Sequence, residues 1–191
     1  MASSEHTPAA ASDHGNIFLV GLMGAGKTSV GKVLARLLGK EFLDSDHEIE
    51  RVTGVRIPVI FEIEGEAGFR AREHKMIAEL VMRKNILLAT GGGAVLLREN
   101  RDLLKANGTI IYLRAPVKAL LRRTLRDRSR PLLQVPNPAA KLSDLYAQRD
   151  PLYCEVAHLI FETGSQSVRA LALQIEAKLK TCSIRNPSVA H

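Results

Sequence analysis

The chain has no tryptophan, and aromatic residues make up only 4% of its 191 residues. Proteins that bind single-stranded nucleic acid rely on aromatic rings on which successive bases stack. The sequence supplies few such rings and contains no block of five like charges. Both shortages argue against a surface that binds nucleic acid.

Cysteine is also rare, with only Cys154 and Cys182. A disulfide framework is therefore not expected, and a reducing compartment is the default. The six histidines are scattered without the spacing of metal ligands. No apolar run approaches the ~18 residues of a membrane span, and residues 1–15 lack the basic and apolar regions of an export signal. We expect a cytoplasmic protein with no membrane partner.

The overall composition fits one compact domain, because 46% of the residues are hydrophobic and 25% are charged. We predict disordered tails at residues 1–15 and 183–191 around a single domain at 16–182. The net charge is +7, and the densest group of arginines lies in residues 122–130. With so few aromatic residues, this charge favours small phosphorylated or carboxylated ligands over nucleic acid.

The most informative segment is Gly21–Thr28, which reads GLMGAGKT and matches the phosphate-loop pattern G-x-x-x-x-G-K-[ST]. An apolar run precedes it at residues 16–20. Apolar residues recur at helical spacing after it, and Gly39 is placed to end that helix. A strand, loop and helix are the context that the motif requires. The sequence therefore predicts binding of a nucleoside triphosphate, whereas a glycine-rich turn in some other α/β protein is the alternative.

Strand-like and helix-like segments alternate along the rest of the chain, which predicts an α/β fold with a parallel sheet between two layers of helices. We expect a three-layer sandwich with five strands, at residues 16–20, 41–44, 85–89, 108–113 and 157–163. Helices are expected after residue 27, over most of 46–83, from Pro116, over 141–149 and over 168–179. Residues 127–140 contain three prolines and are predicted to form a mobile loop.

Ligands of such folds collect at the carboxyl ends of the strands. Asp44 and Asp46 leave the second predicted strand, and residues two apart in an extended chain face the same side. Both carboxylates could therefore face the phosphate loop, one supporting Mg²⁺ and the other holding a substrate hydroxyl. The alternative is that they cap the next helix.

Four further features are weak when each is taken alone. Arg70 lies three residues before Glu73, so the carboxylate can hold the guanidinium, although an ordinary surface pair would have the same spacing. The run Gly91–Gly93 weakens a strand and indicates either close approach of a ligand or a flexible turn. Arg130 and Arg149 are isolated arginines in segments that are otherwise expected to be solvated.

Together, these motifs resemble those of the shikimate kinase family, in the nucleoside-monophosphate-kinase-like branch of P-loop proteins. The resemblance runs from about Asn16 to Leu179. It rests on the segments GLMGAGKTSVG, FLDSDHEIE, FEIEGEAGFRAREHK, LATGGGAV, RPLL and QRDPLY. It implies the P-loop kinase fold and ATP-dependent phosphorylation of the 3-hydroxyl of shikimate, a step toward chorismate and the aromatic amino acids. Pro58–Phe61 departs from many relatives, which leaves the pocket shape there open.

The resemblance also implies how the nucleotide is bound. ATP would be held by Gly24, Ala25, Gly26, Lys27, Thr28, Ser29, Arg123, Arg130 and Gln166. Within this set Lys27 would contact the γ-phosphate, Arg123 the adenine and Gln166 the base. Arg130 would belong to a lid over residues 124–140. Thr28 and Asp44 would hold Mg²⁺.

Shikimate would be bound by a second set of residues, within a helical segment at about 45–75 and beyond it. This set is Asp46, Arg70, Gly91, Gly92, Gly93 and Arg149. Arg70 and Arg149 would hold the carboxylate, and the glycines would form a floor beneath the ring. A reference pKa near 3.9 makes Asp46 a poor base at neutral pH. Asp46 is therefore expected to orient the hydroxyl and take its proton late. Lys27, Asp46 and Arg130 are the expected catalytic residues.

Two alternatives remain at this point, and the chain is expected to act as a monomer. A kinase of another hydroxy acid, such as gluconate, would share the phosphate loop but not the full set of motifs. An ATP-dependent regulatory module that binds nucleic acid would explain the charge of +7, and it would bind DNA or RNA with a steep dependence on salt.

Overall fold

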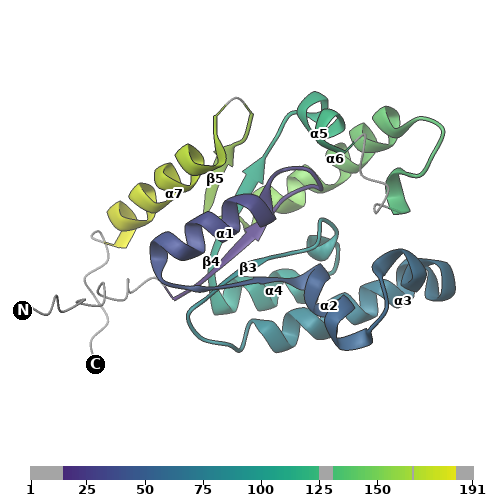
Figure 1. Cartoon of the computed structure of the whole chain (residues 1–191), viewed down its shortest axis with the longest axis horizontal. Helices are drawn as coiled ribbons and strands as arrows, with labels where there is room; N and C mark the ends of the chain where they lie inside the picture. The colour runs from purple at the N-terminus through teal and green to yellow at the C-terminus, as the bar shows by residue number, and fades with distance from the viewer. Residues whose placement is uncertain (1–14, 125–130, 165, 184–191) are drawn as a thin grey trace, which may run out of the picture.

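The computed structural model describes residues 15–124, 131–164 and 166–183. Strands and helices alternate along most of this length, as the sequence predicts (Figure 1). The strands are β1 Asn16–Val20, β2 Glu41–Asp44, β3 Ile86–Ala89, β4 Gly108–Arg114 and β5 Leu159–Glu162. The α-helices are α1 Lys27–Leu38, α2 Ser45–Thr53, α3 Ile57–Leu80, α4 Arg98–Asn107, α5 Val117–Thr124, α6 Pro138–Val156 and α7 Val168–Ser183. Two short 3₁₀ helices are η1 Ala94–Leu96 and η2 Pro131–Leu133.

The sheet has five strands in the order β2-β3-β1-β4-β5, and each neighbouring pair is parallel. Every residue of β1 and β3 is buried, as expected for inner strands that are covered on both faces. Helices α1 and α7 pack against each other, while α4 and α6 contact β4. The chain moves one way along the sheet from β1 to β2 and the other way from β3 to β4, so right-handed crossovers place α1 and α4 on opposite faces. The predicted three-layer α/β fold is confirmed.

The predicted extent of one helix needs correction. The helix expected over 141–149 runs from Pro138 to Val156 and passes through Pro151. A proline inside a helix usually ends it. Here one face of α6 is buried at helical spacing, and the packing of that face outweighs the lost backbone hydrogen bond. The buried residues of this face are Leu142, Leu145, Arg149, Tyr153 and Val156.

The stretch predicted as a loop over 127–140 contains η2 and the first residues of α6, so the loop prediction is wrong for residues 131–133 and 138–140. Pro138 is placed at the start of α6, where its missing N–H has no helical partner to lose. The Asn137 side chain caps the same end by accepting a hydrogen bond from the Ala140 N–H at 3.1 Å. Residues 125–130 of the predicted lid, residues 1–14 of the tail predicted at 1–15 and residues 184–191 of the tail predicted at 183–191 lie outside the described residues. Ser183 belongs to α7, so the second tail was predicted to begin one residue too early.

Helix α3 is broken at Gly65, which has φ of 68° and ψ of −175°. Only glycine adopts such a conformation readily. The break turns the first part of the helix, which carries Phe61, back over the second part, which carries Phe69. Their ring centroids are 4.8 Å apart. Both rings line the cavity described below.

Candidate active site

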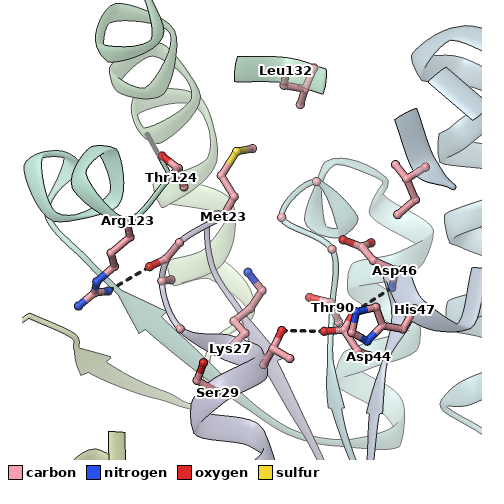
Figure 2. A pocket seen from close by; sticks show the side chains of 18 of the residues that line it. Met23, Lys27, Ser29, Asp44, Asp46, His47, Thr90, Arg123, Thr124 and Leu132 are labelled. Carbon is pink, nitrogen blue, oxygen red and sulfur yellow. Dashed lines mark hydrogen bonds between the residues drawn. The ribbon is translucent and has the colours of Figure 1, made fainter. Parts of the chain in front are cut away.

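One cavity of about 810 Å³ lies at the carboxyl ends of the strands. It is lined at one end by the phosphate loop and at the other by residues of α2, α3 and α6. Figure 2 shows Lys27, Asp44, Asp46 and Thr90 around its centre. The position agrees with the rule that ligands of parallel α/β sheets bind beyond the carboxyl ends of the strands.

The phosphate loop joins β1 to α1 and contains three glycines with positive φ. Gly21 has φ of 140°, Gly24 has φ of 79° and Gly26 has φ of 100°. A methyl group at Gly24 would also lie 2.9 Å from Cγ2 of Thr124, so α5 closes against this part of the loop. Helix α1 begins directly after Gly26, and its free N–H groups and dipole therefore favour an anion at this point.

Lys27 is buried at the first residue of α1. Its ammonium donates hydrogen bonds to the carbonyl oxygens of Gly21 at 2.6 Å and of Leu22 at 3.0 Å. These carbonyls belong to the same loop. They hold the charge beside the helix N-terminus, within reach of the space where the loop N–H groups would bind phosphate.

A hydroxyl and a carboxylate meet at the next residue of α1. The Thr28 hydroxyl donates to Oδ2 of Asp44 at 2.7 Å. Oδ1 of Asp44 accepts from the Asp46 N–H at 3.1 Å and caps α2. The capping alternative therefore holds for Asp44, together with its position in the cavity. Asp46 lies in the first turn of α2 and not in an extended segment. The helix turn therefore brings it to the cavity. The predicted reason, that Asp44 and Asp46 face one side of an extended chain, was wrong.

The nucleotide end of the cavity is closed by contacts between α5 and the segment after β5. Arg123 donates to the Gly24 carbonyl at 3.0 Å and to the Thr163 hydroxyl at 3.3 Å. Gln166 donates to the Glu162 carbonyl at 3.1 Å. Arg123 thus joins the phosphate loop to the loop after β5, and Figure 2 shows its bond to the phosphate loop.

At the opposite end, two carboxylates hold the guanidinium of Arg70. Glu73 lies 2.5 Å from Nη1 and Glu66 lies 2.9 Å from Nη2. The predicted pair with Glu73 is confirmed, and Glu73 is fully buried. The contact with Glu66 was missed, although its spacing of four residues is a normal signal for a pair on one helix.

The three glycines after β3 lie against these side chains. A methyl group at Gly93 would come within 2.3 Å of the Arg70 guanidinium. At Gly91 it would lie 2.3 Å from Oε1 of Glu73 and 2.8 Å from Oδ1 of Asp46. None of the three has positive φ. Glycine is needed here for close approach and not for backbone conformation.

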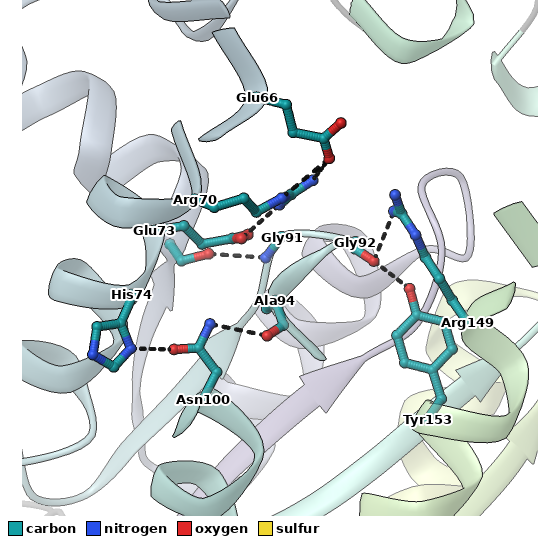
Figure 3. Close-up of polar contacts among 11 residues, drawn as sticks. Glu66, Arg70, Glu73, His74, Gly91, Gly92, Ala94, Asn100, Arg149 and Tyr153 are labelled. Carbon is teal, nitrogen blue, oxygen red and sulfur yellow. Dashed lines mark hydrogen bonds and ion pairs between the residues drawn. The ribbon is translucent and has the colours of Figure 1, made fainter. Parts of the chain in front are cut away.

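The carbonyl of Gly92 accepts hydrogen bonds from two residues of α6. Nη1 of Arg149 donates at 3.1 Å, and the Tyr153 hydroxyl donates to the same oxygen. Figure 3 shows both side chains reaching Gly92 from α6, on the opposite side from Arg70. Arg149 is 2% exposed, and its Nε atom has no hydrogen-bond partner among the described residues.

The electrostatics of this end depend on burial. Burial raises the pKa of Glu73 to about 7, and the charge of Asp46 adds to this effect, although Arg70 opposes it. Burial acts to lower the pKa of Arg70, but the two carboxylates outweigh it and raise that pKa. Burial lowers the pKa of Arg149, yet a guanidinium keeps its proton in proteins. The cavity therefore presents two cations to any ligand, of which Arg149 is buried and Arg70 is partly exposed.

The raised pKa of Glu73 predicts a dependence of stability on pH. Its ordinary value is 4.5, so the stabilisation is fully present below about pH 4.5 and is lost as pH rises through about 7. Between pH 5 and pH 8 the wild type should lose about 2 kcal/mol of unfolding free energy that Glu73→Gln does not lose. Urea unfolding at both pH values measures the difference. Glu66→Gln, which removes the exposed carboxylate from the same guanidinium, should follow the wild type.

The cavity brings together every predicted site residue that the structure describes. They are Gly24, Ala25, Gly26, Lys27, Thr28, Ser29, Asp44, Asp46, Arg70, Gly91, Gly92, Gly93, Arg123, Arg149 and Gln166. Arg130 lies outside the described residues. Tyr153 was missed because the helix was expected to end at residue 149. Once α6 continues past Pro151, the spacing of four residues places Tyr153 on the same face as Arg149.

The fold and this site define a P-loop kinase that acts on a small molecule. A five-stranded parallel sheet carries a phosphate loop at one end of a cavity, and two arginines occupy the other end. Within the described residues, no helix is long and apolar enough to cross a membrane.

Comparison with known proteins identifies the family. Residues 23–180 match the family model of shikimate kinase. A shikimate kinase of Nitrosomonas europaea is 59% identical over 166 residues, which are 87% of this chain and 79% of the relative. One of Burkholderia pseudomallei is 58% identical over 171 residues, 90% of this chain and 93% of the relative. The chain belongs to the shikimate kinase family, whose members transfer phosphate from ATP to shikimate.

Solved structures distinguish members of this family from other proteins with the same fold. The shikimate kinase from Acinetobacter baumannii in complex with shikimate is 56% identical, with a TM-score of 0.88 over 89% of this chain and 95% of that chain. A gluconokinase from Sinorhizobium meliloti is only 17% identical, with a TM-score of 0.59 over 89% and 94% of the two chains. That second likeness shows the fold alone. The family match therefore supports the predicted shikimate kinase over the gluconate alternative.

Proposed function

We propose that this chain transfers the γ-phosphate of ATP to the 3-hydroxyl of shikimate, and that Arg70 and Arg149 hold the shikimate carboxylate. The observation that carries this proposal is the position of the two guanidinium groups. They come from different helices, lie on either side of Gly91–Gly93 and face a cavity whose other end is the phosphate loop. Guanidinium groups bind carboxylates through paired hydrogen bonds. The buried Nε of Arg149 supplies a further donor.

Asp46 is proposed to orient the reacting hydroxyl. It lines the cavity between the phosphate loop and the arginines, and a carboxylate accepts a hydrogen bond from an alcohol. Phosphoryl transfer passes through a loose transition state, so the hydroxyl keeps its proton until late in the reaction. Asp46 needs only to accept that proton as the new P–O bond forms.

Positive charge for the transferred phosphate is proposed to come from Lys27, which would exchange its contacts with the Gly21 and Leu22 carbonyls for phosphate oxygens. The loop at Gly24–Ser29 would bind the remaining phosphate oxygens through its N–H groups. Arg123 and Gln166 border the nucleotide end and are assigned to the adenine. The role of Arg130 at the phosphates rests on the family resemblance.

Mg²⁺ fits the pair formed by Thr28 and Asp44. Hydroxyl and carboxylate oxygens are the ligands that this ion prefers, and it is commonly held by one or two protein groups with substrate phosphates. The described residues contain no group of three or more His, Cys, Asp or Glu side chains that could hold a metal alone. When bound, Mg²⁺ would neutralise charge on the β- and γ-phosphates. The Thr28 hydroxyl would then turn from Asp44 toward the ion.

Asp44→Asn tests this assignment, because asparagine keeps an oxygen for the helix cap but removes the charge and the acceptor of the Thr28 hydroxyl. The Mg²⁺ concentration for half-maximal activity should rise about 10- to 100-fold, as for other outer ligands of metals. A magnesium titration at fixed ATP measures it, with the exposed Asp102→Asn on α4 as the control. An unchanged midpoint would remove Asp44 from the metal site.

A crystal structure with shikimate tests the whole arrangement. The carboxylate should lie within hydrogen-bond distance of Arg70 and Arg149, with the ring above Gly91–Gly93 and one hydroxyl on Asp46. Phosphorus NMR of the product should show the phosphate on the 3-hydroxyl. A carboxylate bound at the phosphate loop would contradict the proposed orientation.

We also infer that the enzyme acts as a monomer in the cytoplasm. Every residue assigned above comes from one chain, and ATP is supplied in the cytoplasm. Sedimentation at micromolar concentration should give one species near 20.9 kDa.

A further inference from the structure

The Gly92 carbonyl has a second donor whose role the reaction does not explain. Arg149 and the Tyr153 hydroxyl both donate to this oxygen (Figure 3). A carbonyl oxygen has two lone pairs and can accept both bonds. The backbone at Gly92 also lies close to the phosphate loop, because a methyl group there would be 3.3 Å from the Met23 nitrogen. The position of this carbonyl therefore affects both the Arg149 guanidinium and the phosphate loop at Met23.

The helix turn that carries Arg149 has less backbone support than an ordinary turn. Pro151 lies inside α6 and has no N–H, so the carbonyl four residues earlier, at Ala147, receives no helical hydrogen bond from it. Side-chain contacts must therefore fix the orientation of this turn. Tyr153 lies two residues after the proline, on the same face of the helix as Arg149.

Tyr153 is well held for this purpose. Its side chain is fully buried, and its ring lies 4.9 Å from the ring of Tyr112 on β4. Burial raises the pKa of Tyr153, so its hydroxyl keeps the proton that it donates. A rigid ring with a fixed donor defines where the Gly92 oxygen lies.

We propose that Tyr153 is a positioning residue for shikimate: its hydroxyl fixes the Gly92 carbonyl, and that carbonyl orients the Arg149 guanidinium toward the substrate carboxylate. This inference rests on the proposed function, in which Arg149 binds shikimate. Tyr153 itself has no contact with substrate. It acts through the Gly92 oxygen, which also accepts a hydrogen bond from Arg149.

Tyr153→Phe is the direct test, because it removes only the hydroxyl and leaves Arg149 as a partner for Gly92. The KM for shikimate should rise about 2- to 13-fold, the size of one hydrogen bond, while kcat and the KM for ATP stay unchanged. The matched control is Tyr112→Phe, whose hydroxyl donates to Asp150 at 2.8 Å. It should lower Tm by about 2–4 °C without a change in the KM for shikimate. An unchanged KM in Tyr153→Phe overturns the inference.

A double-mutant cycle with Arg149→Ala separates this inference from the proposed function. If Tyr153 acts through Arg149, Tyr153→Phe has no further effect on shikimate binding once Arg149 is alanine. Additive effects would overturn the inference while leaving Arg149 in its place. If Arg149→Ala itself leaves shikimate binding unchanged, the proposed function fails instead.

Discussion

Lys27→Met should lower kcat by about 10³-fold, which is the effect of removing a main donor to the charge that develops in a transition state. Methionine keeps most of the length of the side chain and is tolerated in a buried place. The fold should therefore persist, because the hydrogen bonds of Lys27 to Gly21 and Leu22 lie within its own loop. Measuring ADP release with saturating ATP and shikimate gives the change in kcat.

Lys32→Met provides the matched control, since Lys32 is an exposed lysine on the same helix. It should keep wild-type turnover. Circular dichroism of both variants checks that α1 is intact. A Lys27→Met enzyme with kcat within tenfold of the wild type would mean that the ammonium does not stabilise the transferred phosphate.

Arg149→Ala should raise the Kd for shikimate by about two to three orders of magnitude, because truncating one partner of a buried charge pair costs about 2–5 kcal/mol. The affinity for ATP should change little, since Arg149 is assigned to the shikimate carboxylate and not to the phosphates. Titration calorimetry with each ligand separately measures both constants.

Arg149→Lys should restore only part of the shikimate affinity, because an ammonium cannot form the paired hydrogen bonds of a guanidinium. Shikimate binding that survives in Arg149→Ala while ATP binding collapses would mean that the two ends of the cavity are assigned in reverse.

The phosphate loop and the alternation of strands and helices were predictable because they depend on local patterns. Gly24 and Gly26 signal a loop, and the apolar spacing after Lys27 signals a helix. Five parallel strands followed from the alternation of segments. The resemblance then supplied residues that no spacing connects, such as Arg70 and Arg149, which are 79 positions apart in the sequence.

What the sequence did not predict depends on contacts between distant segments. The continuation of α6 through Pro151 results from burial of one helix face against the rest of the fold, which a local rule about proline cannot include. Tyr153 was missed for the same reason, because the helix was expected to end at residue 149. The shared contact of Thr28 and Asp44 was predicted as proximity, but the hydrogen bond between them required the relative placement of α1 and β2.

The glycine run beside Arg70 has a consequence for drug resistance. A single methyl group at residue 91 or 93 collides with the side chains of Glu73, Asp46 or Arg70. A substitution at these positions that weakened an inhibitor would also disturb the enzyme itself. A compound designed to rest on this bare stretch of backbone would therefore meet a surface that selection cannot readily change.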